Sequence, residues 1–272
     1  MKLADLHLHT FFSDGTFSPQ ELVNEARRAE LSCIAITDHD MISGIAPAQK
    51  IAADSLEVIP GIELSAEIDS KEIHILGYFI DTQSLRLQNE IEKINKIRRE
   101  RVFEMVDKLN KLGIDLEAED VFKVAGQGSI SRLHIAMAMV SKGKVSNIYE
   151  AFSRYIGNKG PAYVGKFSLT PQDTIGLIKE AKGVAFLAHP QASNCDELIP
   201  SFVKADLRGL EVYYPEHSQS TVNYYLQMAN KHNLLVTGGS DCHGLAKPEV
   251  GVGKVAIPYE LVERLKKDCY GQ

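Results

Sequence analysis

The sequence predicts an α/β fold, a distorted seven-stranded βα barrel that carries a helical insertion. Short apolar runs alternate with amphipathic helical stretches along the chain, which is typical of βα units. One long helical stretch interrupts this alternation between the fourth and fifth strands. Seven strands with helices between them indicate a barrel.

The predicted strands are the short apolar runs near residues 3–9, 33–37, 57–63, 73–80, 184–188, 209–213 and 234–238. The helix after the first strand begins at Ser18-Pro19-Gln20-Glu21, which supplies an N-cap, a proline at N1 and a capping-box glutamate. It is expected to end near Glu30. The stretch Thr170-Pro171-Gln172-Asp173 repeats this signal before the fifth strand. Further helices are predicted near 195–205, 218–232 and 258–267.

The connection between the third and fourth strands is too short for a parallel crossover. Strand three is expected to end near Ser65 and strand four to begin near Ile73, whereas a crossover needs about a dozen residues or more. The sequence therefore predicts an antiparallel hairpin. Such a hairpin would place His74 beside Glu63.

The helical stretch between strands four and five predicts a subdomain. Apolar residues recur there at spacings of mostly three and four, and an insertion of this size exceeds an ordinary loop. We therefore expect a barrel domain from residues 1–83 and 161–272 and a helical insertion subdomain from residues 84–160.

Charge is unevenly distributed along the chain. The net charge is −6, but the stretch from Glu90 to Lys166 holds 14 Lys and Arg against 10 Asp and Glu, a net +4. An acidic chain is not expected to coat long duplex nucleic acid. Part of the remaining acidity is expected to belong to metal ligands.

The sequence shows no signal for a membrane or for secretion. The amino-terminal MKLADLHLHT lacks a basic leader and an apolar core, and no stretch approaches the roughly 18 apolar residues of a membrane span. The four cysteines are scattered without a C-x-x-C pair, which fits a reducing compartment. We expect a cytoplasmic protein with no membrane partner.

Histidines and carboxylates cluster at the strand ends. His7 and His9 are two residues apart on the first strand, so both imidazoles point to one face. An H-x-H pair alone is a weak signal, but Asp14 follows in a Ser-Asp-Gly turn, and six further candidates lie near other strands: His39, Glu63, His74, His189, Asp241 and His243. Active sites of βα barrels assemble at the carboxyl ends of the strands. Asp38 and Asp40 are expected to orient His39.

The motifs HLHTFFSDG, ITDHD, PGIELS, AHP and GSDCHG resemble those of the PHP (polymerase and histidinol phosphatase) family. The resemblance implies a distorted seven-stranded barrel and three ion sites. Their ligands would be His7, His9, Glu63 and Asp241 for the first, Glu63, His74 and His189 for the second, and Asp14, His39 and His243 for the third.

This donor set has a chemical meaning of its own. Imidazole and carboxylate ligands without thiolate suit manganese, zinc or iron, and we expect two or three divalent ions, with manganese foremost. A bridging carboxylate holds two ions about 3.5–4 Å apart, where they activate water and offset phosphoryl charge. The sequence thus predicts phosphoester hydrolysis without a Ser or Cys nucleophile.

Basic residues of the insertion are candidates for substrate binding. Ser129–Ala136 begins a helix, so backbone N–H groups and Arg132 are placed to receive a phosphate. Lys159 is a second candidate, whereas Arg154 and Lys166 are expected on the solvated surface. His217, in the Tyr213–His217 stretch after strand six, is suited to a base contact or to protonating a leaving group.

The segments SRLHIA, NKGPAYV and GLEVYYPEH resemble a PHP subgroup that acts on 3',5'-nucleoside bisphosphates and on short 5'-phosphorylated RNA. This resemblance implies a nucleotide or short single-stranded RNA substrate, with Arg132, His134 and Lys159 on its phosphates. A phosphatase for histidinol phosphate or another small phosphomonoester, and a catalytically silent PHP module, are the alternatives. The sequence leaves the main substrate, the native metal and the oligomeric state open.

Overall fold

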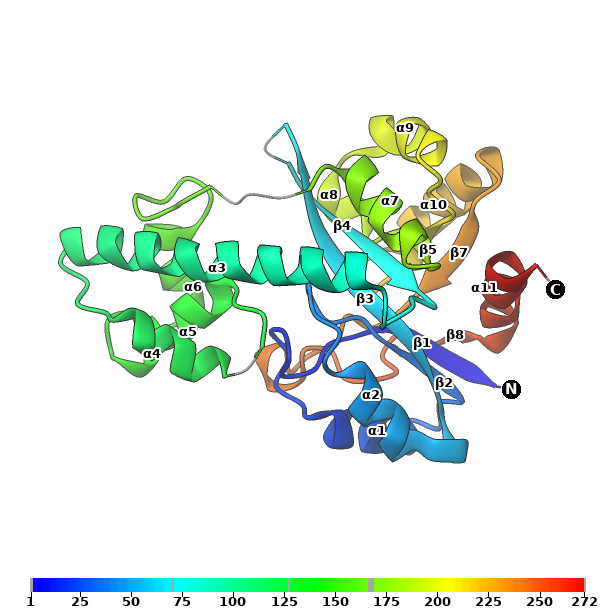
Figure 1. Ribbon diagram of the computed structural model, residues 1–272, viewed down its shortest axis with the longest axis horizontal. Coiled ribbons are helices and arrows are strands. Elements are labelled where there is room, and N and C mark those ends of the chain that lie inside the picture. The colour runs from blue at the N-terminus through cyan, green and yellow to red at the C-terminus, as the bar shows by residue number, and fades with distance from the viewer. Residues whose placement is uncertain (1, 70, 127, 166–168, 272) are drawn as a thin grey trace.

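A computed structural model describes residues 2–69, 71–126, 128–165 and 169–271 (Figure 1). Its eight strands form one sheet in the order β7-β6-β5-β4-β3-β2-β1-β8. The strands are β1 Leu3–Leu8, β2 Cys33–Ile36, β3 Glu57–Ile68, β4 Lys71–Tyr78, β5 Val184–Leu187, β6 Gly209–Tyr213, β7 Leu235–Gly238 and β8 Ile257–Pro258. The α/β class is confirmed, and all seven expected strands are present.

The sheet curls until its ends nearly meet. Just beyond β7, Cys242 forms a parallel bridge with Leu8 of β1. Backbone hydrogen bonds from Asp241 N–H to the His7 carbonyl (2.8 Å) and from His9 N–H to the Cys242 carbonyl (3.1 Å) accompany this bridge. The distorted barrel predicted from the sequence is thereby confirmed. The additional strand β8 pairs antiparallel with β1 and is too short to give a periodic signal.

The hairpin between β3 and β4 is confirmed and is longer than expected. The two strands pair antiparallel from Gly61 with Tyr78 to Ile68 with Lys71. Glu63 therefore lies within β3 and not at its end, so that part of the prediction is wrong. The antiparallel partner supplies the hydrogen bonds that extend both strands beyond the apolar run.

The helices around the sheet follow their sequence signals closely. In α1 (Pro19–Arg28), the Ser18 hydroxyl accepts from Glu21 N–H at 3.2 Å and the Glu21 carboxylate accepts from Ser18 N–H at 2.8 Å. The others are α2 Ile45–Ala52, α7 Pro171–Glu180, α8 Pro190–Ser193, α9 Ile199–Lys204, α10 Gln219–Lys231 and α11 Tyr259–Tyr270. The helix expected near 195–205 is shorter, because a 3₁₀ turn at Asp196–Leu198 precedes α9.

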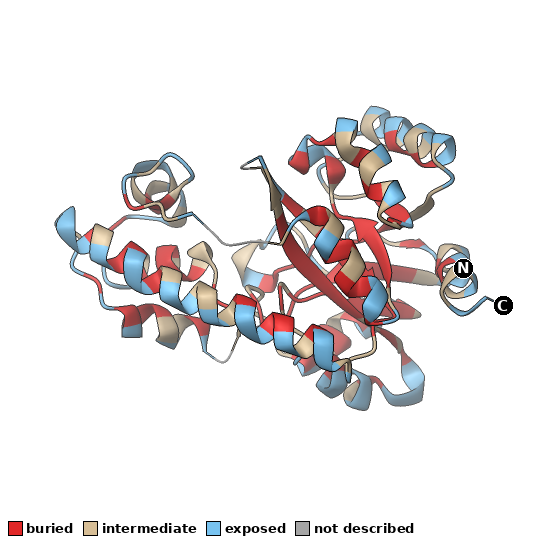
Figure 2. Cartoon of the chain, turned by 45° about the horizontal axis from the view of Figure 1, so that its top comes forward, coloured by how far each residue is buried: buried red, intermediate tan, exposed pale blue. Residues whose placement is uncertain are grey.

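The insertion is helical and has buried residues of its own. It contains α3 Leu85–Lys111, α4 Ala118–Ala125, α5 Arg132–Ser141, α6 Ile148–Ala151 and a π-helical turn at Phe152–Ile156. Leu87 and Ile91 of α3 pack in the barrel core, whereas Met105 and Leu109 belong to a second cluster with α4 and α5. The long helix α3 runs from the barrel to α4 and α5, and buried residues recur along it (Figures 1 and 2). We propose on this basis that residues 84–160 form a subdomain on a barrel of residues 1–83 and 161–272. No helix of the described chain has the length and apolarity to span a membrane.

Candidate metal centre

The imidazoles of β1 lie inside the barrel, both fully buried. His9 Nε2 is 3.0 Å from Asp241 Oδ1 and 3.3 Å from Glu63 Oε2. His7 Nε2 is 3.4 Å and 3.1 Å from the same two oxygens. Barrel closure between β1 and the segment after β7 brings Asp241 to this place.

The carboxylate of Glu63 is the centre of the cluster. Five imidazole nitrogens surround its two oxygens. They are His74 Nδ1 at 2.9 Å and His189 Nε2 at 3.1 Å from Oε1, and His7 Nε2 at 3.1 Å, His39 Nδ1 at 3.2 Å and His9 Nε2 at 3.3 Å from Oε2. A single carboxylate so surrounded is placed to bridge two cations.

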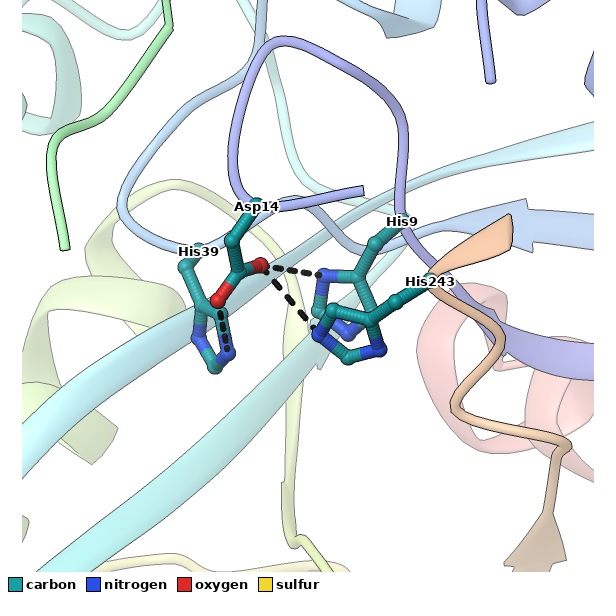
Figure 3. Close-up of side chains that lie close together, drawn as sticks. All are labelled: His9, Asp14, His39 and His243. Atoms are coloured by element: carbon teal, nitrogen blue, oxygen red, sulfur yellow. Dashed lines mark ion pairs between the residues drawn. The ribbon is translucent and has the colours of Figure 1, made fainter. Parts of the chain in front are cut away.

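A second carboxylate, Asp14, lies among His9, His39 and His243 (Figure 3). Its Oδ1 is 3.2 Å from His243 Nε2 and 4.0 Å from His9 Nδ1, and its Oδ2 is 3.9 Å from His39 Nε2. The His9 and His243 rings stack with centroids 4.2 Å apart. Three chain segments far apart in sequence, His9 with Asp14, His39 and His243, therefore meet at this point.

All nine candidates come together, in arrangements that differ slightly from the ion sets implied by resemblance. Three groups have ligand atoms within 4.8 Å of one another: His7, His9, Glu63 and Asp241; His9, Asp14, His39 and His243; and His39, Glu63 and His74. The first group is the ligand set that the resemblance implies for the first ion. The second group contains the three residues implied for the third ion, Asp14, His39 and His243, and adds His9. In the third group His39 takes the place expected for His189, which still lies 3.1 Å from Glu63.

The chemistry of this donor set fits divalent cations. Among the described residues, His9 Nε2, Asp14 Oδ1, His39 Nδ1 and His74 Nδ1 are buried. Although each lies within 3.2 Å of one of the side-chain atoms named above, none makes a hydrogen bond of acceptable geometry. A buried polar atom without a partner costs about 1–3 kcal/mol, so four of them in one cluster would be unfavourable without a ligand. A cation bound among them would satisfy these atoms.

Electrostatics keep the carboxylates charged. Although burial raises it, the neighbouring imidazoles hold the pKa of Glu63 well below its usual value, and the same holds for Asp14 and Asp241. Burial lowers the pKa of His39 to about 3, which leaves its ring neutral and able to act as a ligand. Although burial lowers them, the pKa values of His9 and His74 are raised to about 9 by the neighbouring carboxylates, and that of His7 is raised well above its usual value. These rings would carry protons that a bound cation displaces.

Glu211 is a functional candidate that the sequence analysis missed. It is fully buried in β6, where its Oε1 lies 2.8 Å from His7 Nδ1 and its Oε2 accepts from His189 N–H at 2.8 Å. It therefore fixes the ring of one candidate ligand and the backbone of another. The sequence signal that could have identified Glu211 is a charged residue within the apolar run of a predicted buried strand.

Asp38 and Asp40 have partners other than the expected His39 ring. The Asp38 carboxylate accepts from Thr10 N–H and Ser13 Oγ, both at 2.7 Å, and so holds the loop that carries Asp14. The Asp40 carboxylate accepts from Ser65 N–H at 2.9 Å and pairs with Arg98. Both residues fix the backbone around the cluster.

Asp241 has two further partners that sequence reasoning did not single out. Tyr214 OH and Lys247 Nζ each donate to Asp241 Oδ2 at 2.9 Å. Its other oxygen, Oδ1, remains directed at His7 and His9. Asp241 is thereby held in one orientation from outside the cluster.

A pocket of about 180 Å³ joins the cluster to the insertion. It is lined by Asp14, His39 and His74 of the cluster, by Glu72, and by the guanidinium-bearing Arg98, Arg101 and Arg132. Arg132 Nη1 donates to Asn158 Oδ1 at 2.5 Å, and its Nη2 lies 3.6 Å from Glu72 Oε2. Arg101, which the sequence analysis missed, donates from Nε to the Val164 carbonyl at 2.9 Å. Burial and the neighbouring Arg132 lower the pKa of Arg101 to about 10.

The other predicted substrate residues lie outside this pocket. His134 is buried and lines a second pocket that also contains Asp14. Lys159 is exposed in a turn. His217 Nδ1 lies 2.8 Å from the Val212 carbonyl, and its ring centroid is 5.3 Å from that of Tyr214.

The two basic residues expected on the surface have different outcomes. Arg154 is exposed and pairs with Glu150, as expected of a surface residue. Lys166 lies outside the described residues.

A βα barrel whose strands converge on imidazoles and carboxylates defines a metal-dependent hydrolase. The chain belongs to the PHP family, because the PHP domain model matches residues 5–236. Within that family it is a metal-dependent phosphoesterase.

Similar proteins agree in fold and length. A 5'-3' exoribonuclease of Haemophilus influenzae is 33% identical over 248 residues, which cover 89% of the chain and 90% of that protein. A 3',5'-nucleoside bisphosphate phosphatase of Chromobacterium violaceum is 30% identical, covering 88% and 86%. The crystal structure of a protein described as a metal-dependent phosphoesterase, from Bifidobacterium adolescentis, superposes with a TM-score of 0.88 at 31% identity, covering 96% and 94%.

Proposed function

We propose that this enzyme hydrolyses phosphate esters of nucleotides, foremost 3',5'-nucleoside bisphosphates and short 5'-phosphorylated RNA in the 5'-3' direction. The observation that carries this proposal is the shared pocket, where cluster residues and three arginines line one space. Burial and the neighbouring Arg132 lower the pKa of Arg101, and guanidinium groups side by side in one pocket favour an anionic occupant. The names of the two relatives above point to the same substrate class.

We propose that two or three divalent cations, manganese foremost, bind to His7, His9, Asp14, His39, Glu63, His74, His189, Asp241 and His243. When bound, the ions activate water and offset negative charge on the reacting phosphate. The side chains hold the ions and exclude bulk water, since most of them are buried. Glu211 keeps the His7 ring in the orientation that directs Nε2 into the cluster.

Arg132 is the proposed contact for a second phosphate of the substrate. A reacting phosphate at the ions is already neutralised, so an additional guanidinium contributes most by binding a phosphate elsewhere on the molecule. Arg101, beside it, strengthens that positive field. His134, Lys159 and His217 are further proposed substrate contacts.

The proposal is tested by phosphate release with added manganese from four substrates: a 3',5'-bisphosphate, a mononucleotide, histidinol phosphate and a 5'-phosphorylated oligoribonucleotide. We expect the bisphosphate and the oligoribonucleotide to be preferred. Preference for histidinol phosphate would favour the small phosphomonoester alternative. No release from any of them would favour the silent module.

Arg132→Ala sharpens this test. We expect kcat/KM for the bisphosphate to fall about ten- to a hundredfold, the value of a charge-assisted contact of roughly 1.5–3 kcal/mol. A simple artificial phosphoester should be hydrolysed as before, because its phosphate meets only the ions. Arg154→Ala, which removes an exposed arginine of the same insertion, is the matched control. An equal loss on every ester would place Arg132 at the reacting phosphate instead.

The location in the cytoplasm also stays a proposal. It is supported by the four cysteines, all of which are free and three of which are buried. Cell fractionation checks it.

A further inference from the structure

A second pocket, of about 530 Å³, opens on the other part of the insertion. One wall is the loop after β1, with Phe11, Asp14, Gly15 and Thr16, and the other is formed by α4 and α5. From these helices come Val124, Ala125, Gly126, His134 and Met137. Its volume falls within the range of roughly 300–1,000 Å³ that is typical of ligand sites.

This pocket meets the arginine pocket at one residue. Asp14 lines both of them and belongs to the metal cluster. The walls are tied together, because Ser129 N–H donates to the Phe12 carbonyl at 2.8 Å. Asp14 thus places this space directly beside the metal cluster.

The lining differs sharply from that of the arginine pocket. It contains no Lys or Arg, and most of its members are apolar. Phe11 is 41% exposed although it is a large hydrophobic residue next to the cluster, and it is the aromatic side chain of the lining. An exposed aromatic ring beside a polar site is suited to stacking on a flat ligand group.

His134 gives this pocket one directional polar group. Its Nδ1 accepts from Ser131 N–H at 3.0 Å within the N-terminal cap of α5, so Nδ1 cannot carry the proton of the neutral ring. Burial lowers the pKa of His134, which favours that neutral ring. The proton is then on Nε2, and the imidazole is a donor of fixed tautomer.

We propose that this pocket binds the nucleobase of the nucleotide whose reacting phosphate lies at the metal cluster, with Phe11 against the base and His134 Nε2–H donating to its edge. The inference rests on the proposed nucleotide substrate and adds a specificity-determining subsite to it. A base presents both a flat apolar face and ring acceptors, which is the combination that the lining recognises. The base of the substrate would then lie in this pocket, and its second phosphate would lie in the arginine pocket.

The test compares adenosine 3',5'-bisphosphate with its abasic analogue, which keeps both phosphates and lacks the base. We expect the wild type to have the higher kcat/KM on the base-bearing substrate. Phe11→Ala should lower that value about tenfold and leave the abasic substrate unchanged, because only the stacking contact is lost. The control is Phe103→Ala, which removes another exposed phenylalanine, from α3 and outside the pocket.

Two more variants probe the same space in different ways. His134→Asn keeps a side-chain acceptor for Ser131 N–H but withdraws the Nε2–H donor, so it should lose preference for the base while the helix cap is kept. Val124→Trp fills the pocket and should act selectively against the base-bearing substrate. Far-UV circular dichroism checks that each variant is folded.

Each outcome supports or overturns the inference. Equal wild-type kcat/KM on the two bisphosphates would overturn it and would leave the proposed function intact, since Arg132 tests that separately. An equal loss on both substrates in Phe11→Ala would show that Phe11 supports the Asp14 loop and does not bind the base. Failure of the wild type to hydrolyse either bisphosphate would refute the proposed function and this inference together.

Discussion

At the scale of single residues, the site depends on carboxylates that each collect several imidazoles. Glu63 is within 3.3 Å of five imidazole nitrogens, and Asp241 Oδ1 is within 3.5 Å of three histidines. Such an assembly is stable only if the carboxylates remain charged and the nitrogens find a cation or a proton. Its residues are therefore expected to matter for metal binding more than for folding.

The first prediction concerns two of these residues. His7→Ala and Asp241→Ala should each abolish hydrolysis and lower the metal content, because each removes a proposed ligand and little core packing. Activity assays, metal analysis by mass spectrometry and circular dichroism check the three parts. His232→Ala, at the C-terminal end of α10, is the control histidine. Normal turnover with unchanged metal content in either variant would refute the ligand assignment.

The second prediction concerns Glu211, which is not itself a proposed metal ligand. Glu211→Gln keeps the size of the side chain but replaces one acceptor oxygen by an amide donor, so its bonds with His7 Nδ1 and His189 N–H cannot both persist. We expect metal affinity to fall about 10- to 100-fold, as for other groups that orient metal-bound histidines. Competition with a chelator measures this. Activity should recover at saturating metal, and affinity equal to the wild type would contradict the role.

At the scale of elements, close packing between neighbouring strands limits what β6 accepts. A Cβ built on Gly209 would lie 1.9 Å from Phe186 Cε1 and 2.7 Å from the Leu235 carbonyl oxygen. These are atoms of β5 and β7, the two neighbours of β6. The strand therefore requires glycine at its start for a close approach.

The third prediction follows from this packing. Gly209→Ala should lower the free energy of unfolding by about 1–3 kcal/mol, because Phe186 must leave its position in the core. Gly176→Ala, in α7, is a control of opposite sign: a Cβ there meets nothing within 4 Å, and alanine favours helix by about 0.5–1 kcal/mol. Urea denaturation measures both. Equal stability of the two variants would contradict the packing account.

At the scale of the whole molecule, closure of the sheet creates the site. The bridge between Leu8 and Cys242 joins β1 to the segment after β7. It sets His7 and His9 beside Asp241. The insertion then covers this region through Arg98, which donates to Ser65 Oγ and pairs with Asp40. The proposed metal ligands, the barrel closure and the arginine pocket are thus parts of one arrangement.

The fourth prediction concerns that coupling. Chelation should abolish activity, manganese should restore it, and added manganese should raise the melting temperature, because a ligand bound only by the folded state stabilises it. Thermal unfolding with and without metal measures the shift. Asp241→Ala should show a smaller shift than the wild type. Full activity in a metal-free preparation would refute the metal dependence of hydrolysis.

The sequence by itself determined the alternation of strands and helices, the capped helix starts and the hairpin between β3 and β4. These features depend on local signals: apolar periodicity, a serine or threonine with proline, and a connection too short to cross over. The His and carboxylate motifs could be found for the same reason, since each lies within a few residues of a strand. We expected these motifs to lie close together because the carboxyl ends of the strands meet in a βα barrel.

The tertiary structure alone decided which residues surround that cluster. Arg101 lies in none of the quoted motifs, and Glu211 lies in GLEVYYPEH without a role that the segment itself indicates. Their roles come from partners far away in the sequence, such as His7 at 204 residues from Glu211. The full length of β3 and the place of Glu63 within it depend on hydrogen bonds from β4. The two pockets meet at Asp14 because α4 and α5 pack over the loop after β1. Such contacts arise only when closure of the sheet fixes distant segments against each other, and no local pattern encodes them.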